Sequence, residues 1–175
     1  MERRAFFRWR YVKDERRKGY KQGAAALVIS IPLFLFLQQY VVATGKVTDV
    51  SMLPTLKEGD YFFINKAIYH LAAPRRGEIV VLQPFEDKPW YYVKRIIGLP
   101  GETVRIAGGR VWVDGRELDE PYAAGQTLPA TGPLTIGADS YFLLGDNREN
   151  SEDSRIFGTI PSKRISGRIR AGKQS

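Results

Sequence analysis

The sequence predicts a mainly β protein, in which an antiparallel, sheet-like or barrel-like domain follows one N-terminal transmembrane helix. Three observations lead to this fold class. Residues 23–45 carry no charged side chain, short runs of β-branched and aromatic residues alternate with Gly and Pro after residue 46, and no long helical periodicity follows. Of the 175 residues, about 130 remain after the uncharged run, which is enough for one domain with its own core.

The uncharged run GAAALVISIPLFLFLQQYVVATG, residues 23–45, predicts a membrane-spanning helix, because about 20 apolar residues suffice to cross a bilayer. A buried helix of a soluble protein and a cleaved signal peptide are the alternatives. The run is apolar on all faces, which argues against the first, and the basic leader of 22 residues is long for the second. Residues 1–22 hold nine Lys or Arg and three acidic residues, so the positive-inside rule places them in the cytoplasm and residues 46–175 on the opposite side.

The net charge of +8 is concentrated at the two ends of the chain. Residues 1–22 carry +6 and residues 161–175 carry +5, whereas residues 23–160 carry −3. We therefore expect no nucleic-acid partner, while the basic leader is suited to contact anionic lipid of the bilayer. The chain has no cysteine and one histidine, His70, so neither a disulfide nor a metal site built on Cys or His is expected.

The expected strands follow one another at short intervals, in the segments DYFFIN, GEIVVLQP, WYYVKRII, ETVRIAG, RVWV, DSYFLLG and GTIPSKRISGRIR. Gly108-Gly109 and Asp114-Gly115 predict two tight hairpin turns with four residues between them. The stretch NKAIYHLAA is the one place where a short helix is expected. The segment Arg105–Asp139 is predicted to hold a hairpin and a loop.

Two adjacent cations, Lys94 and Arg95, lie in the apolar strand YYVKRII. Alternate residues of a strand share a face, so these two side chains point to opposite sides. If Lys94 is buried, desolvation favours its neutral amine, which can act as a base. A lysine whose ammonium group extends to solvent from an edge strand is the alternative.

Two polar stretches complete a possible catalytic set. Ser51 lies in VTDVSMLPTLKEGD, where Pro54 predicts a turn, and a serine beside a neutral lysine can attack a carbonyl group. The polar segment GDNRENSEDSR, Gly145–Arg155, directly follows the apolar strand YFLLG. A structural turn at Ser51 and a solvated loop held by Asx turns are the alternatives.

Taken in order behind a predicted membrane span, SMLPTLKEGD, RRGEIVVL, YYVKRIIGLPGE and GDNRENSEDSR resemble the successive motifs of bacterial type I signal peptidases. These are membrane-anchored Ser-Lys proteases that remove signal peptides from exported precursors. The resemblance covers Val47–Pro161. It implies that Ser51 is the nucleophile, that Lys94 is its general base, and that no metal or cofactor takes part.

The resemblance also implies roles for nearby residues. The Ser151 hydroxyl would orient the Lys94 amine, and Asp153 would form a supporting ion pair with Arg155. Asp146 would be the partner of Arg95.

The same resemblance implies a shallow pocket that admits only small side chains, and hence Ala-X-Ala-like cleavage sites. Its walls would be formed by Met52, Leu56, Tyr92 and Val93.

One position departs from the family pattern. Many members have a serine two residues before the nucleophile, and its hydroxyl helps to form the oxyanion hole; here that residue is Asp49. A carboxylate cannot donate a hydrogen bond and would repel an oxyanion. We therefore expect the Ser51 N–H to be one donor, with the Thr48 hydroxyl, another N–H or a water as the second, and Asp49 is expected to point to solvent.

The resulting hypothesis is an endopeptidase of the plasma (inner) membrane with three parts: a cytoplasmic segment 1–22, a single span 23–45 and an extracytoplasmic Ser-Lys peptidase domain 46–175. Exported precursors that carry signal peptides would be its substrates. Exposed aromatics such as Trp90 could rest on the membrane surface, whereas Phe62 and Phe63 are better suited to a core. A Ser-Lys enzyme with another task, such as a conjugation-linked processing peptidase, and an inactive signal-peptide-binding relative are the alternatives.

Overall fold

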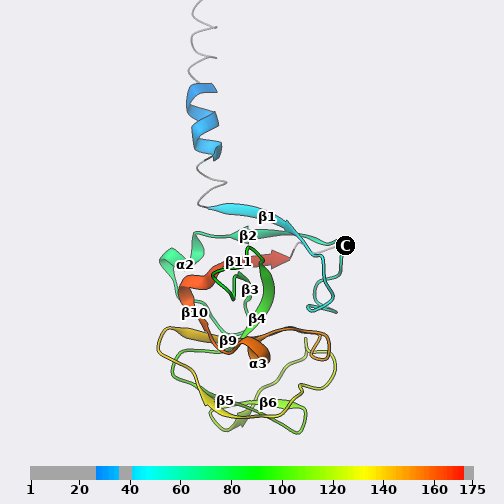
Figure 1. Cartoon of the computed structure of the whole chain (residues 1–175). Coiled ribbons are helices and arrows are strands. Elements are labelled where there is room, and N and C mark those ends of the chain that lie inside the picture. The colour runs from blue at the N-terminus through cyan, green and yellow to red at the C-terminus, as the bar shows by residue number, and fades with distance from the viewer. Residues whose placement is uncertain (1–26, 36–40, 172–175) are drawn as a thin grey trace, which may run out of the picture. The chain divides into compact units, whose positions relative to one another are not determined.

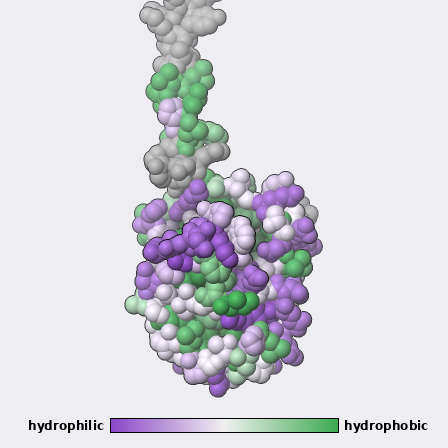
Figure 2. All heavy atoms as spheres, in the orientation of Figure 1, coloured by the Kyte–Doolittle hydropathy of each residue, from purple (hydrophilic) through white to green (hydrophobic). Residues whose placement is uncertain are grey.

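The computed structural model describes residues 27–35 and 41–171, which belong to two units, 1–41 and 42–175. In the first unit, residues 27–35 form a helix with exposed apolar side chains, which Figure 2 shows in green. Within the described ranges, no helix has both the length and the apolar character that crossing a membrane requires. The predicted segment 1–22 and residues 23–26 and 36–40 of the predicted span lie outside the described residues.

The second unit is mainly antiparallel β structure, which confirms the predicted class of this domain. Its strands are β1 Val42–Lys46, β2 Tyr61–Asn65, β3 Ile79–Leu82, β4 Tyr92–Gly98, β5 Thr103–Ala107, β6 Arg110–Val113, β7 Arg116–Glu117, β8 Thr131–Thr135, β9 Ser140–Leu144, β10 Ile160–Pro161 and β11 Ile165–Ala171. Two short α-helices, α2 Ile68–Leu71 and α3 Ser154–Phe157, and one 3₁₀ turn, Ser162–Arg164, accompany them.

The strands form two sheets (Figure 1). The larger sheet has the order β1-β2-β11-β3-β4-β9-β10, and the smaller has the order β7-β6-β5-β8. The last strand, β11, lies between β2 and β3, where Arg168 is opposite both Asn65 and Val80. Strand β4, which carries Lys94 and Arg95, lies between β3 and β9 in the interior of the larger sheet.

The start of the domain differs from the sequence prediction. Residues 42–45, the end of the predicted span, belong to β1, which pairs with β2 from Val42 opposite Asn65 to Lys46 opposite Tyr61. Val42 and Thr44 are β-branched and favour a strand as readily as an apolar helix. An uncharged run does not by itself separate these two conformations.

Local turn chemistry explains the small sheet. Gly108 and Gly109 (φ 60° and 76°) connect β5 to β6, and Asp114 and Gly115 (φ 49° and 76°) connect β6 to β7. Positive φ at both central residues is the hairpin geometry that these residue pairs favour, so both predicted turns are confirmed. The short helix expected in NKAIYHLAA is α2.

Strand β8 is absent from the prediction, which assigned its residues to a loop. It contains Gly132 and Pro133, which weaken strand propensity. The strand tolerates them because it lies at the edge of the smaller sheet.

The burial of the aromatic residues agrees only in part with the sequence prediction. Phe62 is buried as expected, whereas Phe63 is exposed and that expectation was wrong. Trp90 is exposed.

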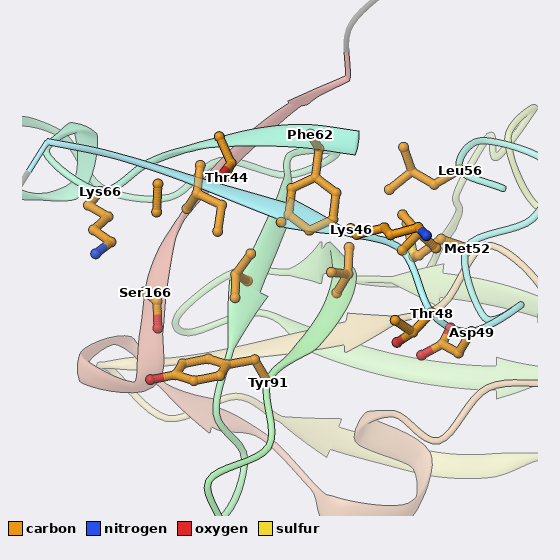
Figure 3. Close-up of a pocket in the computed structure, with 16 residues that line it drawn as sticks. Thr44, Lys46, Thr48, Asp49, Met52, Leu56, Phe62, Lys66, Tyr91 and Ser166 are labelled. Carbon is orange, nitrogen blue, oxygen red and sulfur yellow. The ribbon is translucent and has the colours of Figure 1, made fainter. Parts of the chain in front are cut away.

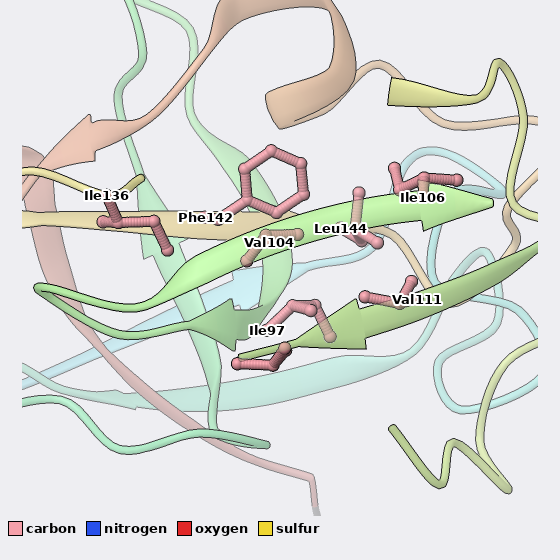
Figure 4. Close-up of a cluster of buried hydrophobic side chains, with 8 residues drawn as sticks. Ile97, Val104, Ile106, Val111, Ile136, Phe142 and Leu144 are labelled. Atoms are coloured by element: carbon pink, nitrogen blue, oxygen red, sulfur yellow. The ribbon is translucent and has the colours of Figure 1, made fainter. Parts of the chain in front are cut away.

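The two sheets share a hydrophobic core (Figure 4). Ile97, Phe142 and Leu144 of the larger sheet pack there with residues of the smaller sheet, which include Val104, Ile106 and Val111. This cluster anchors the smaller sheet beneath β4 and β9. The other face of β4 contributes Ile96 to a second cluster with Val80 and Leu143.

Candidate active site

The central feature is a hydrogen bond between Lys94 of β4 and Ser51 of the turn that follows β1. The Nζ atom of Lys94 lies 2.6 Å from Ser51 Oγ, although 43 positions separate the two residues in the chain. Only 1% of Lys94 and 5% of Ser51 are accessible to solvent. The structure thus brings together the two side chains that the sequence suggested as nucleophile and base.

Burial weakens proton binding by Lys94. Desolvation lowers the pKa of Lys94 below the ordinary lysine value, and the charges of Asp49, Asp153 and Glu152 raise it by a smaller amount. Within the described part of the chain, no carboxylate is within ion-pair distance of Lys94. The amine therefore loses its proton more readily than an exposed lysine, as a general base requires.

The turn that carries Ser51 is held by the polar segment after β9. The backbone N–H of Asn147 donates to the carbonyl oxygen of Ser51 (3.0 Å), and the Asn147 amide donates to the carbonyl oxygen of Val50 (3.1 Å). The Thr55 hydroxyl donates to Asp146. These contacts fix Ser51 against β4, because Asp146 also binds β4 through Arg95.

Arg95 and Asp146 form a bidentate ion pair on the face of β4 opposite Lys94. The Nε–Oδ1 and Nη2–Oδ2 distances are 2.8 and 2.6 Å, and the Asp146 side chain is fully buried. The guanidinium carbon of Arg95 also lies 3.9 Å from the centre of the Tyr122 ring. The Arg95–Asp146 pair expected from the resemblance is therefore formed, and it is stacked by an aromatic residue that the sequence did not indicate.

Arg148 was not predicted as a site residue, although it lies within the quoted motif GDNREN. Its side chain is almost fully buried and binds Glu120 through both Nη atoms (2.7 and 2.9 Å). It also donates to Thr127 Oγ1 (2.6 Å) and to the carbonyl oxygen of Gly145 (3.0 Å). Arg148 thus fastens the loop 120–127 to the segment that supports Ser51.

Asp153 and Arg155 form the other expected ion pair, with Nη2 and Oδ2 2.7 Å apart. Asp153 also accepts a hydrogen bond from the backbone N–H of Gly145 (3.1 Å), so this pair braces the end of β9. The hydrogen bond from Ser151 to Lys94 that the resemblance implies is not formed here. The Ser151 Oγ atom is buried and has no hydrogen-bond partner within the described residues, so its role stays a prediction.

Gly145 allows this close arrangement. A Cβ atom added at Gly145 would lie 2.2 Å from Ser151 Oγ and 2.6 Å from the carbonyl oxygen of Ser51. Both distances are far shorter than a van der Waals contact. Glycine is therefore required at position 145 for steric reasons.

A groove of about 600 Å³ extends along β1 beside the dyad (Figure 3). Met52, Leu56 and Val93 line it, and Thr48 and Asp49 lie at one end while Lys66 and Ser166 lie at the other. Tyr92, which was expected beside them, does not line this groove. Because side chains alternate along a strand, Tyr91 faces the groove with Val93, whereas the Tyr92 ring lies 5.6 Å from Lys94 Nζ and packs on Phe157.

The position of Asp49 also differs from the expectation. Asp49 as a whole is exposed to solvent. Its Oδ1 atom, however, accepts a hydrogen bond from the backbone N–H of Ser51 (2.8 Å) instead of pointing to solvent. The backbone N–H that we expected to serve an oxyanion is thus occupied by a carboxylate.

The described residues contain no group of three or more His, Cys, Asp or Glu side chains that could hold a metal ion.

Comparisons with known proteins find one matching family model and several related proteins. Residues 20–172 match the family model described as signal peptidase, peptidase S26. A signal peptidase I of Leptolyngbya laminosa is 40% identical over 154 residues, covering 84% of this chain and 76% of that protein. One of Bacillus amyloliquefaciens is 36% identical over 172 residues, covering 89% and 91%. The crystal structure of a signal peptidase I from Enterococcus faecalis V583 is 30% identical, with a TM-score of 0.51, and covers 57% of this chain and 98% of that chain.

Proposed function

We propose residue roles from the premise that this chain belongs to the signal peptidase family, peptidase S26, and is a serine endopeptidase that removes signal peptides. In this proposal Ser51 is the nucleophile and Lys94 is the general base. The observation that carries it is the 2.6 Å contact between two buried side chains. A buried lysine amine whose hydrogen-bond partner is a hydroxyl is an expensive arrangement that a stable fold does not otherwise need.

In the acylation step, Ser51 Oγ bonds to the carbonyl carbon of the scissile peptide while its proton passes to Lys94 Nζ. The carbonyl π electrons move to the oxygen and form an oxyanion. Collapse of this intermediate breaks the C–N bond, and the leaving amine takes the proton from Lys94. Water then attacks the acyl group, gives a proton to Lys94 and releases a carboxylic acid, and Ser51 recovers its hydroxyl proton from Lys94.

The substrate is proposed to be an exported precursor whose cleavage region lies extended along the groove. Backbone hydrogen bonds would hold an extended segment, and the side chain before the scissile bond would face Met52, Leu56 and Val93. An apolar wall close to the nucleophile rejects large side chains by steric overlap. This favours cleavage after small residues, in Ala-X-Ala-like sequences.

Members of this family are typically bound to membranes. We place residues 1–22 in the cytoplasm, a membrane span in the uncharged run before β1, and the peptidase domain outside the plasma membrane. The support is the charge of +6 on residues 1–22 and the apolar, exposed helix of residues 27–35. The signal peptide of a precursor would then occupy the same bilayer as the enzyme.

The test uses the full chain in lipid vesicles with one purified precursor. Ser51→Ala and Lys94→Ala should each abolish cleavage, whereas Ser162→Ala and Lys163→Ala, outside the site, should retain it. The product termini should map to the bond after a small residue. If either dyad variant cleaves at the parent rate, the proposed mechanism is wrong, and if the parent protein binds the precursor without cleaving it, the protein is the inactive relative considered above.

A further inference from the structure

Asp49 occupies the hydrogen-bond donor that the proposed reaction needs. Its Oδ1 atom lies 2.8 Å from the backbone nitrogen of Ser51, and the residue lines the end of the groove next to Thr48 (Figure 3). In acyl transfer by serine enzymes, the backbone N–H of the nucleophile commonly stabilises the oxyanion. A carboxylate oxygen on that N–H resembles the oxyanion in charge and in hydrogen-bonding geometry.

The two anions exclude each other. One N–H directs its hydrogen toward one acceptor at a time, and a second negative oxygen placed beside the first would be repelled by it. Asp49 is solvent-exposed, so its side chain can turn away into the open groove when a substrate carbonyl arrives. The peptide must therefore displace Asp49 before the oxyanion can use this donor.

We propose that Asp49 is a built-in restraint on acylation, a resident anion on the Ser51 N–H that each precursor has to displace. The inference rests on the proposed Ser51–Lys94 dyad and adds a residue that opposes it. Enzyme without substrate is thereby kept in a form in which the Ser51 N–H cannot serve an oxyanion. A correctly seated cleavage region releases the restraint by filling the groove.

The charge of Asp49 acts on the base as well. Lys94 is surrounded by Asp49, Asp153, Glu152 and Arg155 and by the ring of Tyr92. Burial has the largest effect on the pKa of Lys94 and lowers it. Of the three carboxylates that raise this pKa, Asp49 has the largest effect. Removal of the Asp49 charge should therefore move the acid side of the pH–rate profile to lower pH, in addition to freeing the N–H.

A purely structural role is the competing explanation. An aspartate that accepts the N–H of the second residue after it forms an Asx turn, and such turns commonly stabilise loops. The substitution Asp49→Asn would preserve that turn, since an amide oxygen also accepts a hydrogen bond, and would remove the charge. The substitution Asp49→Ala would remove both the acceptor and the charge, so the two variants separate the turn from the restraint.

The experiment measures the single-turnover acylation rate of the full chain in vesicles, from neutral pH to the plateau where Lys94 is deprotonated. Asp49→Ala should raise the plateau rate by about 10-fold to 100-fold, the range that corresponds to one hydrogen bond to a charged group. Asp49→Asn should raise it by less, because a neutral amide is a weaker acceptor. The matched control is Glu152→Gln, which removes a carboxylate near Lys94 but none from the Ser51 N–H, so its midpoint should move to lower pH with an unchanged plateau.

A plateau rate equal to or below the parent rate in both Asp49 variants would overturn the restraint. If Asp49→Ala has a lower Tm than the parent, Asp49→Asn alone decides, since it keeps the turn. Ser51→Ala is measured in the parent and in the Asp49→Ala background. Cleavage that survives this substitution would refute the dyad, whereas its loss together with an unaccelerated Asp49 series would refute the restraint alone.

Discussion

Lys94 and Arg95 are adjacent in β4, yet Arg95 is neutralised by Asp146 at 2.6 Å while Lys94 has the Ser51 hydroxyl as its hydrogen-bond partner at the same distance. The strand places them on opposite faces, so one supports the fold and the other is available for chemistry. The effects of substituting Lys94 and of substituting the Arg95–Asp146 pair can therefore be measured separately.

The buried Arg95–Asp146 pair should be essential for stability. Asp146→Ala leaves a nearly buried guanidinium without its partner, which typically costs about 3–5 kcal/mol. Glu117→Ala is the matched control, because the Arg110–Glu117 pair is exposed and such pairs contribute about 0–1 kcal/mol. Urea unfolding of the two variants measures the difference, and equal losses would show that Asp146 does not anchor the segment.

Lys94 should lower the stability of the fold in a pH-dependent way. Its folded pKa lies below the unfolded value of about 10.4, so between these two values the unfolded chain binds a proton that the folded chain does not. Lys94→Met should therefore have a higher Tm than the parent, with the full difference below the folded pKa. Scanning calorimetry should show that the gap closes as the pH approaches about 10.4, and a gap independent of pH would contradict the buried amine.

The prediction for Gly145 concerns the space around the Ser51 turn. Gly145→Ala forces a Cβ atom against Ser151 and against the Ser51 carbonyl oxygen, which is backbone and cannot rotate away. Overpacking of this kind costs about 1–3 kcal/mol, and the displaced Ser51 turn should also slow cleavage. Gly137→Ala is the control, since its Cβ atom would lie 3.8 Å from the nearest atom, and it should leave both unfolding and cleavage unchanged.

Ser151 has a buried hydroxyl without a partner among the described residues, which costs stability in this state. We expect it to turn toward Lys94 during acylation and to position the amine. Ser151→Ala should then slow acylation and shift the midpoint of the pH–rate profile, while the Tm stays equal or rises. Ser151→Thr should restore both values, and a pH–rate profile unchanged in Ser151→Ala would show that the hydroxyl has no influence on the base.

Much of this arrangement could be predicted, either from local turn residues or from motifs that resemble a known family. The hairpin turns follow from Gly108-Gly109 and Asp114-Gly115, and the dyad from motifs that resemble a known family. The pairing of Arg95 with Asp146 followed from the same resemblance. Only the two turns depend on residue type and spacing alone, whereas the dyad and the ion pair are what the resemblance implies.

Other features depend on contacts between distant segments and could not be predicted. The stacking of Tyr122 on Arg95 and the binding of Glu120 by Arg148 arise from the docking of loop 120–127, which has no local signal. The direction of the Asp49 carboxylate is set by the turn at Ser51. The position of Tyr92 outside the groove is different, because strand alternation opposed its grouping with Val93 and could have predicted it.

The placement of β11 has a consequence for the folding of the newly synthesised chain. Since this strand fills the gap between β2 and β3, a partly synthesised chain that already contains Ser51 and Lys94 has an open slot in the sheet that supports them. We therefore expect the Ser51–Lys94 site to be complete only after β11 has been synthesised and has paired with β2 and β3.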